Sequence, residues 1–407
     1  MNKIKLFISQ NLSLSFILIT MFLNFLGFSI LIPVIPFLIQ KYVPLHQANL
    51  VGFYTGLLMA TYAICQFLAA PGLGVLSDHI GRRPILLLSL LGSIIGYIFL
   101  GVGGSLAVLF IGRIIDGLTG GNISTVYAYV ADISKPQDRG KIYGLLGAAG
   151  GFGFMIGPVI GGFIGSISLS LPFYIAAGIT ALNLIWGYFI LPESLHAEHR
   201  STHFSLKHLN PFISFKMVAK LPLLRYVFLI GFLFFFPLVN YQTTNALFLK
   251  DILHFGPAQI GLLLFVVGVV DIFAQGYLTH LLLPKWGEYK TCVVGMLIIL
   301  GGGIIVSLVQ FYPHAVLMYL GIIIFILGDG LIEPALSGLI ANSAGPHMQG
   351  RVQGANQSMQ SLARIVGPLY SGMIYSVGTN IPYVSSLFFF CISLILLFRL
   401  KTYTANQ

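Results

Sequence analysis

Long apolar runs that recur along the whole chain are the feature that most restricts its fold. A helix needs about 20 residues to cross the hydrocarbon core of a membrane. The runs do not alternate polar with apolar residues, as the strands of a membrane barrel do. We therefore predict an all-α, polytopic membrane protein with twelve transmembrane helices. The spans are expected at residues 13–39, 51–75, 84–104, 106–131, 140–164, 171–191, 223–249, 258–283, 291–311, 314–341, 352–378 and 381–400.

The composition agrees with this fold class, and the distribution of charge predicts its orientation. The chain is 57% hydrophobic and 8% charged, whereas a soluble domain is about a quarter charged. Lys and Arg accumulate on the cytoplasmic loops of membrane proteins. Of the 21 Lys and Arg residues, 17 fall on the side that holds both termini, Lys41 and Lys250 fall on the other side, and Arg113 and Arg364 lie within spans. We therefore predict a protein of the cell inner membrane with both termini in the cytoplasm, and we explain the net charge of +10 without a nucleic-acid partner.

Neither a signal peptide nor a metal centre is predicted. Lys3 and Lys5 precede an apolar run that is too long for the core of a signal peptide, so the first span is expected to stay in the mature protein. The three cysteines all fall in apolar runs, without the spacing of metal ligands or of a disulfide framework. We expect no metal ion and no cofactor.

The chain divides into two similar halves. A shift of 210 residues places Gly157-Pro158 on Gly367-Pro368 and Gly162 on Gly372. Paired halves of six helices are how many secondary transporters are built, with the substrate site at the midplane between them. We predict an N-terminal half at 1–191, a cytoplasmic linker at 192–222 and a C-terminal half at 223–407. The histidines of the linker have no regular ligand spacing, so a linker is favoured over a metal-binding tract.

A compact group of charges interrupts the apolar runs at residues 74–84. Its sequence, Gly-Val-Leu-Ser-Asp-His-Ile-Gly-Arg-Arg-Pro, lies between the second and third spans. We expect a short, glycine-hinged loop in which Asp78 pairs with Arg82, Arg83 or a neighbouring helix end. Such pairs could hold the cytoplasmic face closed. The alternative is that the two arginines serve only as orientation signals.

These residues resemble a known family. The pattern Gly74-x-Leu76-Ser77-Asp78-x3-Arg82-Arg83-Pro84 is similar to the loop between spans two and three in the major facilitator superfamily. Arg113-x3-Gly117-x2-Gly120, Asp132 and Leu191-Pro192-Glu193-Ser194 resemble its twelve-span drug/proton antiporters, especially the tetracycline exporters. The resemblance implies a major facilitator fold and an inner gate at Gly74, Asp78, Gly81, Arg82 and Arg83. His79 stands where the family usually has a fixed cation, which implies a weaker or pH-sensitive gate.

The fifth span is rich in glycine. Small residues let helix backbones approach closely in lipid, and Pro158 permits a bend. A packing face and a bending, leak-sealing helix are compatible readings, and the resemblance to antiporters favours the second. The positions that match the antiporter pattern are Gly147, Gly151, Gly157, Pro158, Gly161 and Gly162.

Ionisable residues inside spans are the strongest indication of a mechanism. A charge at mid-membrane costs about 2.5–3.5 kcal/mol on insertion scales, so it is usually paired and functional. Asp329 and Glu333 are four residues apart. Two neighbouring carboxylates repel each other as anions, and this repulsion favours a bound proton on one of them, as a proton carrier requires. A static intramembrane salt bridge is the alternative for each acid. The proton-coupling candidates are Arg113, Asp116, Asp271, Asp329, Glu333 and Arg364.

Spans one, three and nine lack the acidic residues that the tetracycline exporters carry there, which weakens the case for tetracycline itself as the substrate. Polar residues within spans could face a substrate cavity, or they could join helices. The candidates for a cavity are Asn24, Gln66, Asn122, Tyr127, Asn240 and Gln242.

We predict a proton-coupled transporter, not an enzyme, that acts as a monomer and exports a small organic compound. A proton-coupled symporter or uniporter that imports a nutrient or siderophore-like metabolite is the alternative, and the antiporter-like glycine-proline pattern of the fifth span argues against it. A non-transporting sensor or enzyme is a third possibility, which no catalytic triad, metal set or soluble domain supports.

Overall fold

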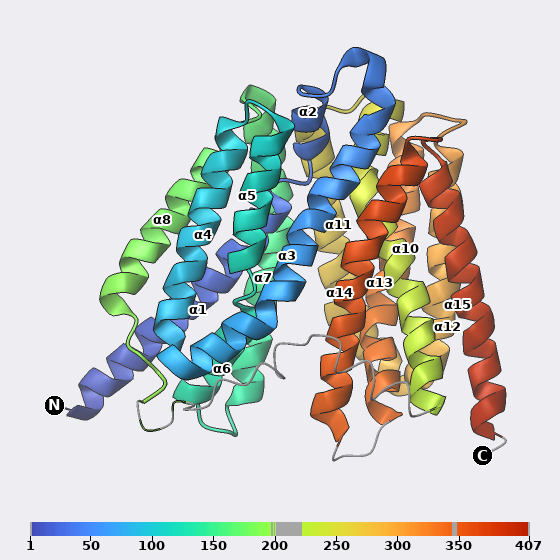
Figure 1. Cartoon of the computed structure of the whole chain (residues 1–407). Helices are drawn as coiled ribbons and strands as arrows, with labels where there is room; N and C mark the ends of the chain where they lie inside the picture. The colour runs from blue at the N-terminus through green and yellow to red at the C-terminus, as the bar shows by residue number, and fades with distance from the viewer. Residues whose placement is uncertain (1, 197, 199, 201–221, 344–347, 406–407) are drawn as a thin grey trace. The chain divides into compact units, whose positions relative to one another are not determined.

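The structure, a computed structural model, describes residues 2–196, 198, 200, 222–343 and 348–405 (Figure 1). The described residues are helical with short connections and contain no strand, which confirms the predicted fold class. The chain divides into two compact units. Unit 1 comprises residues 1–42 and 61–211, and unit 2 comprises residues 43–60 and 212–407. Most of the predicted linker, residues 201–221, lies outside the described residues.

Unit 1 is built around one pair of helices and one group of three helices. Helix α1 packs along α7, and α4 packs against both α5 and α8. The unit contains α1 (Asn2–Ser29), α2 (Ile35–Gln40), the second part of α3 (Val51–Ile80), α4 (Arg82–Val102), α5 (Leu106–Thr119), α6 (Ile123–Ile133), α7 (Arg139–Ile167) and α8 (Leu171–Ile190).

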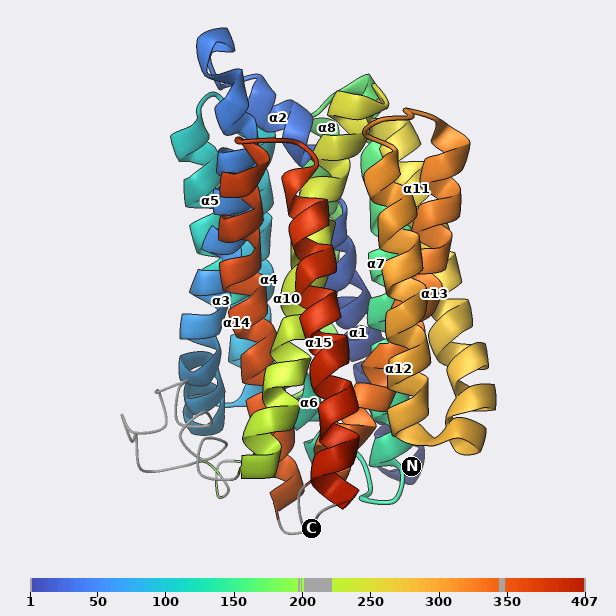
Figure 2. The ribbon, with the colours of Figure 1, turned by 90° about the vertical axis from the view of Figure 1, so that its right-hand side faces the viewer.

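Unit 2 has a similar all-helical build. Helix α12 packs along α13, and α10 contacts both α14 and α15, as Figure 2 shows from the side of α15. The unit contains η1 (Leu45–Leu50), the first part of α3, α10 (Pro222–Ile252), α11 (Pro257–Phe273), the π-helical turn η4 (Ala274–Leu278), α12 (Thr279–Leu308), α13 (Ala315–Asn342), α14 (Gln349–Tyr375) and α15 (Ile381–Ala405).

All twelve predicted runs fall on helices. Ten segments of the described chain are long and apolar enough to cross a membrane, and one of them, Pro257–Leu308, has 52 residues and is long enough for two passes. That segment is interrupted at Gly287, whose φ of 72° departs from helical geometry. The run predicted at 352–378 falls on α14, a 27-residue helix that contains more polar residues than the other spans.

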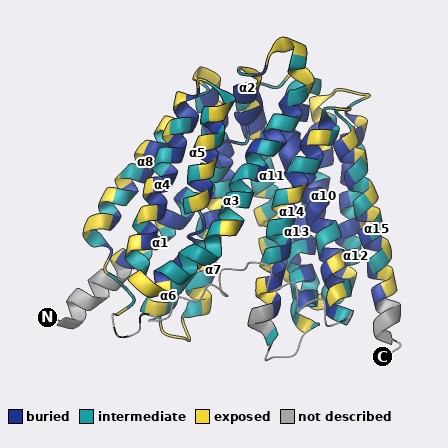
Figure 3. Ribbon diagram, viewed as in Figure 1, coloured by how far each residue is buried: buried dark blue, intermediate teal, exposed yellow. Residues whose placement is uncertain are grey.

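The helices keep large apolar side chains on their outer surfaces. Phe189 is 78% exposed and Leu182 is 67% exposed, and Figure 3 shows exposed residues along the length of the helices as well as at their ends. Water does not accommodate apolar surface on this scale, whereas lipid does. The exposed faces therefore support the membrane location that the sequence predicts.

Candidate functional site

The junction between α3 and α4 is tighter than the predicted loop. Helix α3 extends to Ile80 and α4 begins at Arg82, so only Gly81 lies outside a helix. Its φ of 114° is a conformation that favours glycine. Gly74 lies within α3. The predicted glycine hinge is thus present at Gly81, and the rest of the segment is helical.

Arg82 connects three elements at this junction. Its guanidinium forms an ion pair with Asp78 of α3 and donates to Asp132 near the end of α6, with an Nε–Oδ2 distance of 3.3 Å. It also donates to the Ser77 hydroxyl at 3.0 Å. Arg83 points elsewhere, because its guanidinium donates to the Tyr188 carbonyl at 2.6 Å and lies over the Tyr188 ring. The structure therefore brings together Asp78 and Arg82, but not Asp78 and Arg83.

Glu193 caps the start of α4 and is absent from the predicted site residues. The backbone N–H groups of Arg82 and Arg83 donate to its two carboxylate oxygens at 2.8 and 3.2 Å. The first N–H groups of a helix have no partner within the helix and carry partial positive charge, so a carboxylate suits this position. An acidic residue just after a predicted span, opposite a basic loop, was the available signal in the sequence.

The glycines of α7 divide into two groups. A Cβ atom at Gly157 or Gly161 would collide with α1, at the Ser29 hydroxyl and the Ile30 carbonyl, respectively. A Cβ atom at Gly147 or Gly151 would meet nothing within 4 Å. Of these four glycines, Gly157 and Gly161 therefore belong to the surface of α7 that packs against α1 and the residue after it. The helix continues through Pro158 from Arg139 to Ile167, and Gly162 is buried.

Arg113 and Asp116 form a buried charge cluster within unit 1. Their Nη1 and Oδ2 atoms are 3.5 Å apart, and the Arg113 side chain is fully buried. The Ser93 hydroxyl donates to Asp116 Oδ1 at 2.8 Å, and the guanidinium lies 4.5 Å from the centre of the Tyr62 ring. The pair is thus neutralised locally, as one of the two predicted readings requires.

Three of the predicted cavity residues meet at a break in the fourth span. Residues 120–122 separate α5 from α6. The Gln66 amide donates to the Gly120 carbonyl at 2.9 Å, and the Asn24 amide donates to Asn122 Oδ1 at 3.3 Å. Interrupted spanning helices commonly mark the binding sites of transporters. Tyr127 lies apart from this group and packs against the Tyr143 ring.

The acidic residues of unit 2 gather between α11 and α13. Asp271 and Gln275 lie at the end of α11 and in η4, and the Gln275 Nε2 atom is 2.9 and 3.1 Å from the two Asp271 carboxylate oxygens. The same nitrogen is 3.4 Å from Glu333 Oε2 on α13. Asp329 is buried one turn before Glu333, and its Oδ1 atom has no hydrogen-bond partner among the described residues. Arg364 of α14 is close enough to attract the Glu333 carboxylate.

The last two predicted cavity residues lie on α10. Asn240 is fully buried, and its amide, in the orientation that satisfies its neighbours, donates to the Gly367 carbonyl of α14 at 2.9 Å. Gln242 is exposed. Asn240 therefore joins two helices within unit 2.

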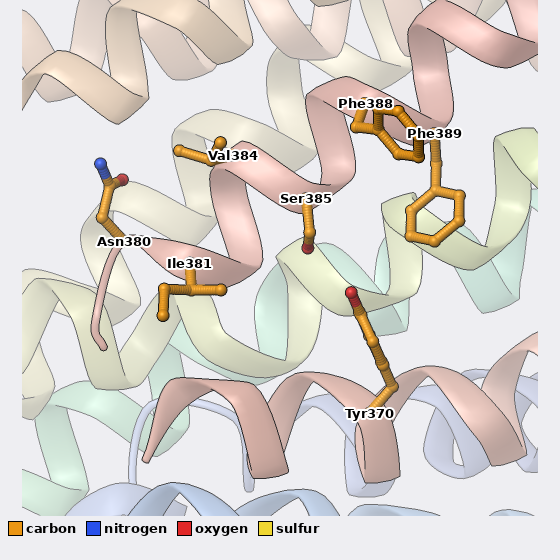
Figure 4. Close-up of a pocket in the computed structure, with 7 residues that line it drawn as sticks. All are labelled: Tyr370, Asn380, Ile381, Val384, Ser385, Phe388 and Phe389. Carbon is orange, nitrogen blue, oxygen red and sulfur yellow. The ribbon is translucent and has the colours of Figure 1, made fainter. Parts of the chain in front are cut away.

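Unit 2 also carries a pocket of about 520 Å³ between α14 and α15. Tyr370, Phe388 and Phe389 line it, and Asn380 lies at its end (Figure 4). Phe388 is 62% exposed, so the pocket is open at the surface of unit 2. It contains none of the predicted site residues. In the part of the chain that the structure describes, no three His, Cys, Asp or Glu side chains gather to hold a metal ion.

Comparison with known proteins assigns the chain to a family. The model of the family described as the Major Facilitator Superfamily matches residues 17–368, which cover most of both units. The chain belongs to the Major Facilitator Superfamily. Its predicted gate, glycine pattern and intramembrane acids all fall within the matched range.

Relatives within the superfamily carry names that refer to drug resistance. The chain is 34% identical over 374 residues to "Tetracycline resistance protein, class C" of Escherichia coli, which covers 91% of each chain. It is 31% identical over 370 residues to "Multidrug resistance protein 2" of Bacillus subtilis (strain 168), which covers 90% of each chain.

Solved structures of the superfamily share the fold. The human organic anion transporter MFSD10 has a TM-score of 0.68 at 24% identity and covers 95% of this chain and 99% of its own. A bacterial homologue of the human lysosomal transporter Spinster, in an inward-facing and unoccupied conformation, has a TM-score of 0.77 at 15% identity and covers 97% of both chains. At these identities the likeness concerns the fold alone.

Proposed function

We propose that this superfamily member is a secondary active transporter that exports small organic drugs in exchange for protons. The tetracycline and multidrug resistance proteins that it resembles over about nine-tenths of its length support the export of drugs. The observation that carries the proton coupling is the acidic group between α11 and α13, where Asp271, Gln275 and Glu333 are joined by hydrogen bonds and Asp329 is buried beside them.

The acidic group has the properties that a proton carrier needs. A buried carboxylate without a partner is costly as an anion, and a bound proton removes that cost. Arg364 offers a competing positive charge to Glu333. Proton binding and release therefore change the charge balance between α11, α13 and α14, and this change can favour one conformation of unit 2 over another. Arg113 and Asp116 are proposed to play a corresponding part in unit 1.

The junction of α3 with α4 is proposed to act as the gate. The pairs of Arg82 with Asp78 and Asp132, together with the Glu193 cap, hold the ends of α3, α4 and α6 in one arrangement. They are partly exposed, so each pair contributes modestly and can exchange partners. The charge distribution supports a cytoplasmic position for this junction and for both termini, and we propose that one chain suffices for transport.

Drug-driven proton movement in inside-out membrane vesicles tests the proposal. Respiration acidifies the vesicle interior, and a pH-sensitive dye reports it. Tetracycline added outside an exporter should raise the internal pH, because drug enters as protons leave. A proton symporter would not relieve the acidification in this way.

Variants of the acidic group make the test specific. Asp329→Asn combined with Glu333→Gln should abolish the dye response, whereas Glu198→Gln, an exposed change outside the helices described above, should leave it intact. Full coupling in the double variant would refute the role of the acidic pair. Absence of any drug response in the unmodified protein, over a panel that includes tetracycline and cationic dyes, would refute drug export.

A further inference from the structure

Gln275 occupies an unusual place in the backbone of unit 2. It lies in η4, a five-residue π-helical turn that follows α11 directly. Such turns are rare and occur frequently at functional sites, because they change the direction in which a helix presents its side chains. The turn lies between Asp271, one turn earlier, and the start of α12.

The π-helical turn is held against α13 at the position of the acids. The Thr279 hydroxyl lies 3.0 Å from the Ala274 carbonyl and 2.8 Å from the Gly330 carbonyl, so it bridges the turn and α13. Gly330 lies between Asp329 and Glu333 in the sequence, and a Cβ atom there would press on Ala274. Two independent contacts therefore fix the height of Gln275 relative to the acids of α13.

The Gln275 amide can bond to both acids at once. Its nitrogen carries two hydrogens, and it lies 2.9 Å from Asp271 Oδ1 and 3.4 Å from Glu333 Oε2. An amide also has an acceptor oxygen. It can therefore donate to a carboxylate and, after rotation, accept from the same group once that group is protonated. A charged or purely apolar side chain could not stay bonded in both states.

We propose that Gln275 is the positioning residue that joins Asp271 and Glu333 into one proton-binding unit across α11 and α13. This inference rests on the proposed proton coupling. Gln275 itself carries no proton. It holds the two acids at a fixed separation and stabilises them as anions, so that proton binding at one of them is felt at the other.

The surroundings contain few competing charges. On α13 the neighbours are Asp329 and Glu333, and on α14 the charged neighbour is Arg364. On α12, His280 is exposed and Glu288 accepts a hydrogen bond from Asn342 at the far end of α13. On α10, Tyr241 stacks on Phe325. The groups expected to set the pH response are thus the three acids, Arg364 and the Gln275 amide.

The test is an infrared titration of the purified full-length protein in lipid vesicles, which follows the carbonyl band of protonated carboxylic acids without any substrate. Gln275→Ala removes the donors that stabilise the anions. The acids should then hold their protons about tenfold more tightly, which moves the midpoint of the titration up by about one pH unit. Gln353→Ala, which removes an exposed amide of α14, is the matched control and should not move it.

Two further variants keep the test decisive if the first does not fold. Gln275→Asn retains an amide but is one methylene too short to reach both acids, and it should move the midpoint in the same direction. Gln275→Glu keeps the size and adds a fourth carboxylate to the three acids, and it should move the midpoint further up. A merely structural role would lower the yield of folded protein without moving the midpoint.

The outcomes separate this inference from the proposed function. If Asp271→Asn and Glu333→Gln each remove part of the titrating band while all folded Gln275 variants titrate like the unmodified protein, the role of Gln275 is refuted and proton binding by the acids stands. If Asp271→Asn, Asp329→Asn and Glu333→Gln all leave the band unchanged, none of the three acids binds protons over the physiological range, and the proposed proton coupling fails together with this inference.

Discussion

The Glu193 carboxylate stabilises the α3–α4 junction, although Glu193 is far from this junction in the sequence. Glu193 is 111 residues from Arg82, yet it receives the first two N–H groups of α4. Its carboxylate is also close to Gly81, where any Cβ atom would collide with it. Two separate features therefore require glycine at position 81. The turn needs its positive φ, and the Glu193 cap needs the space that a side chain would fill.

Removal of the charge from this cap should destabilise the protein measurably. Glu193→Gln leaves one acceptor oxygen for two N–H groups and removes the negative charge from the helix N-terminus. The expected loss is about 1 kcal/mol, seen as a lower midpoint of thermal unfolding for the purified protein. Glu198→Gln is the control, since Glu198 is exposed. Equal midpoints for the two variants would show that the cap does not contribute to stability.

At the scale of helices, close approach of backbones is what distinguishes one glycine from another. Gly161 of α7 faces the carbonyl of Ile30, the residue after the end of α1, whereas Gly178 of α8 has nothing within 4 Å of a Cβ position. Helices pack in lipid mainly through such close contacts, because there is no hydrophobic force between them.

This difference gives opposite expectations for the same substitution. Gly161→Ala should force α1 and α7 apart and cost about 1–3 kcal/mol. Gly178→Ala should leave stability unchanged or raise it slightly, because alanine favours a helix by about 1 kcal/mol over glycine. Thermal unfolding of both variants in the same detergent measures the difference. A loss of stability in both would contradict the assigned packing surface.

The contact of η4 with α13 gives an expectation for transport. A methyl group at Gly330 would collide with Ala274 and displace the π-helical turn from the acids. Gly330→Ala should therefore lower drug-driven proton movement by about 10–100-fold, since displacements of about 1 Å at a reacting site have effects of this size. Gly301→Ala on α12, where a Cβ atom meets nothing, should keep normal activity in the vesicle assay.

At the scale of the whole chain, hydropathy predicted the helices well. Backbone polar groups inside a membrane must bond within their own segment, so long apolar runs become helices whatever their detailed sequence. The acids within spans were identifiable for a related reason, since a charge in an apolar run is conspicuous. Arg113 and Asp116 are three residues apart, a spacing that puts two side chains on the same face of a helix, and the structure pairs them.

Features that depend on tertiary contacts were not predictable in the same way. The break at residues 120–122 falls inside the run predicted at 106–131, and the Gly120 carbonyl is satisfied there by Gln66 from α3. The π-helical turn has an ordinary sequence. Residues 43–60 belong to unit 2 although they precede most of unit 1 in the chain. Each of these depends on partners that are distant in the sequence.

The orientation of the chain in the membrane is a prediction for the molecule as a whole. The excess of Lys and Arg on one side predicts that both termini lie in the cytoplasm. A green fluorescent protein fused to the C-terminus should therefore fluoresce, while alkaline phosphatase fused at the same position should be inactive. Fusions after Lys41 should give the reverse pattern. Phosphatase activity at the C-terminus would invert the assigned orientation.

The single residue between α3 and α4 also limits how this chain can change in length. An α-helix turns by about 100° for each residue. One residue inserted within the first turn of α4 would therefore rotate the rest of α4 relative to that turn, so that α4 could not keep both its contacts with α5 and α8 and the Glu193 cap on its first N–H groups. The connection of one residue has no spare length to absorb this rotation, so a library of single-residue insertions should show loss of transport for insertions in the first turn of α4.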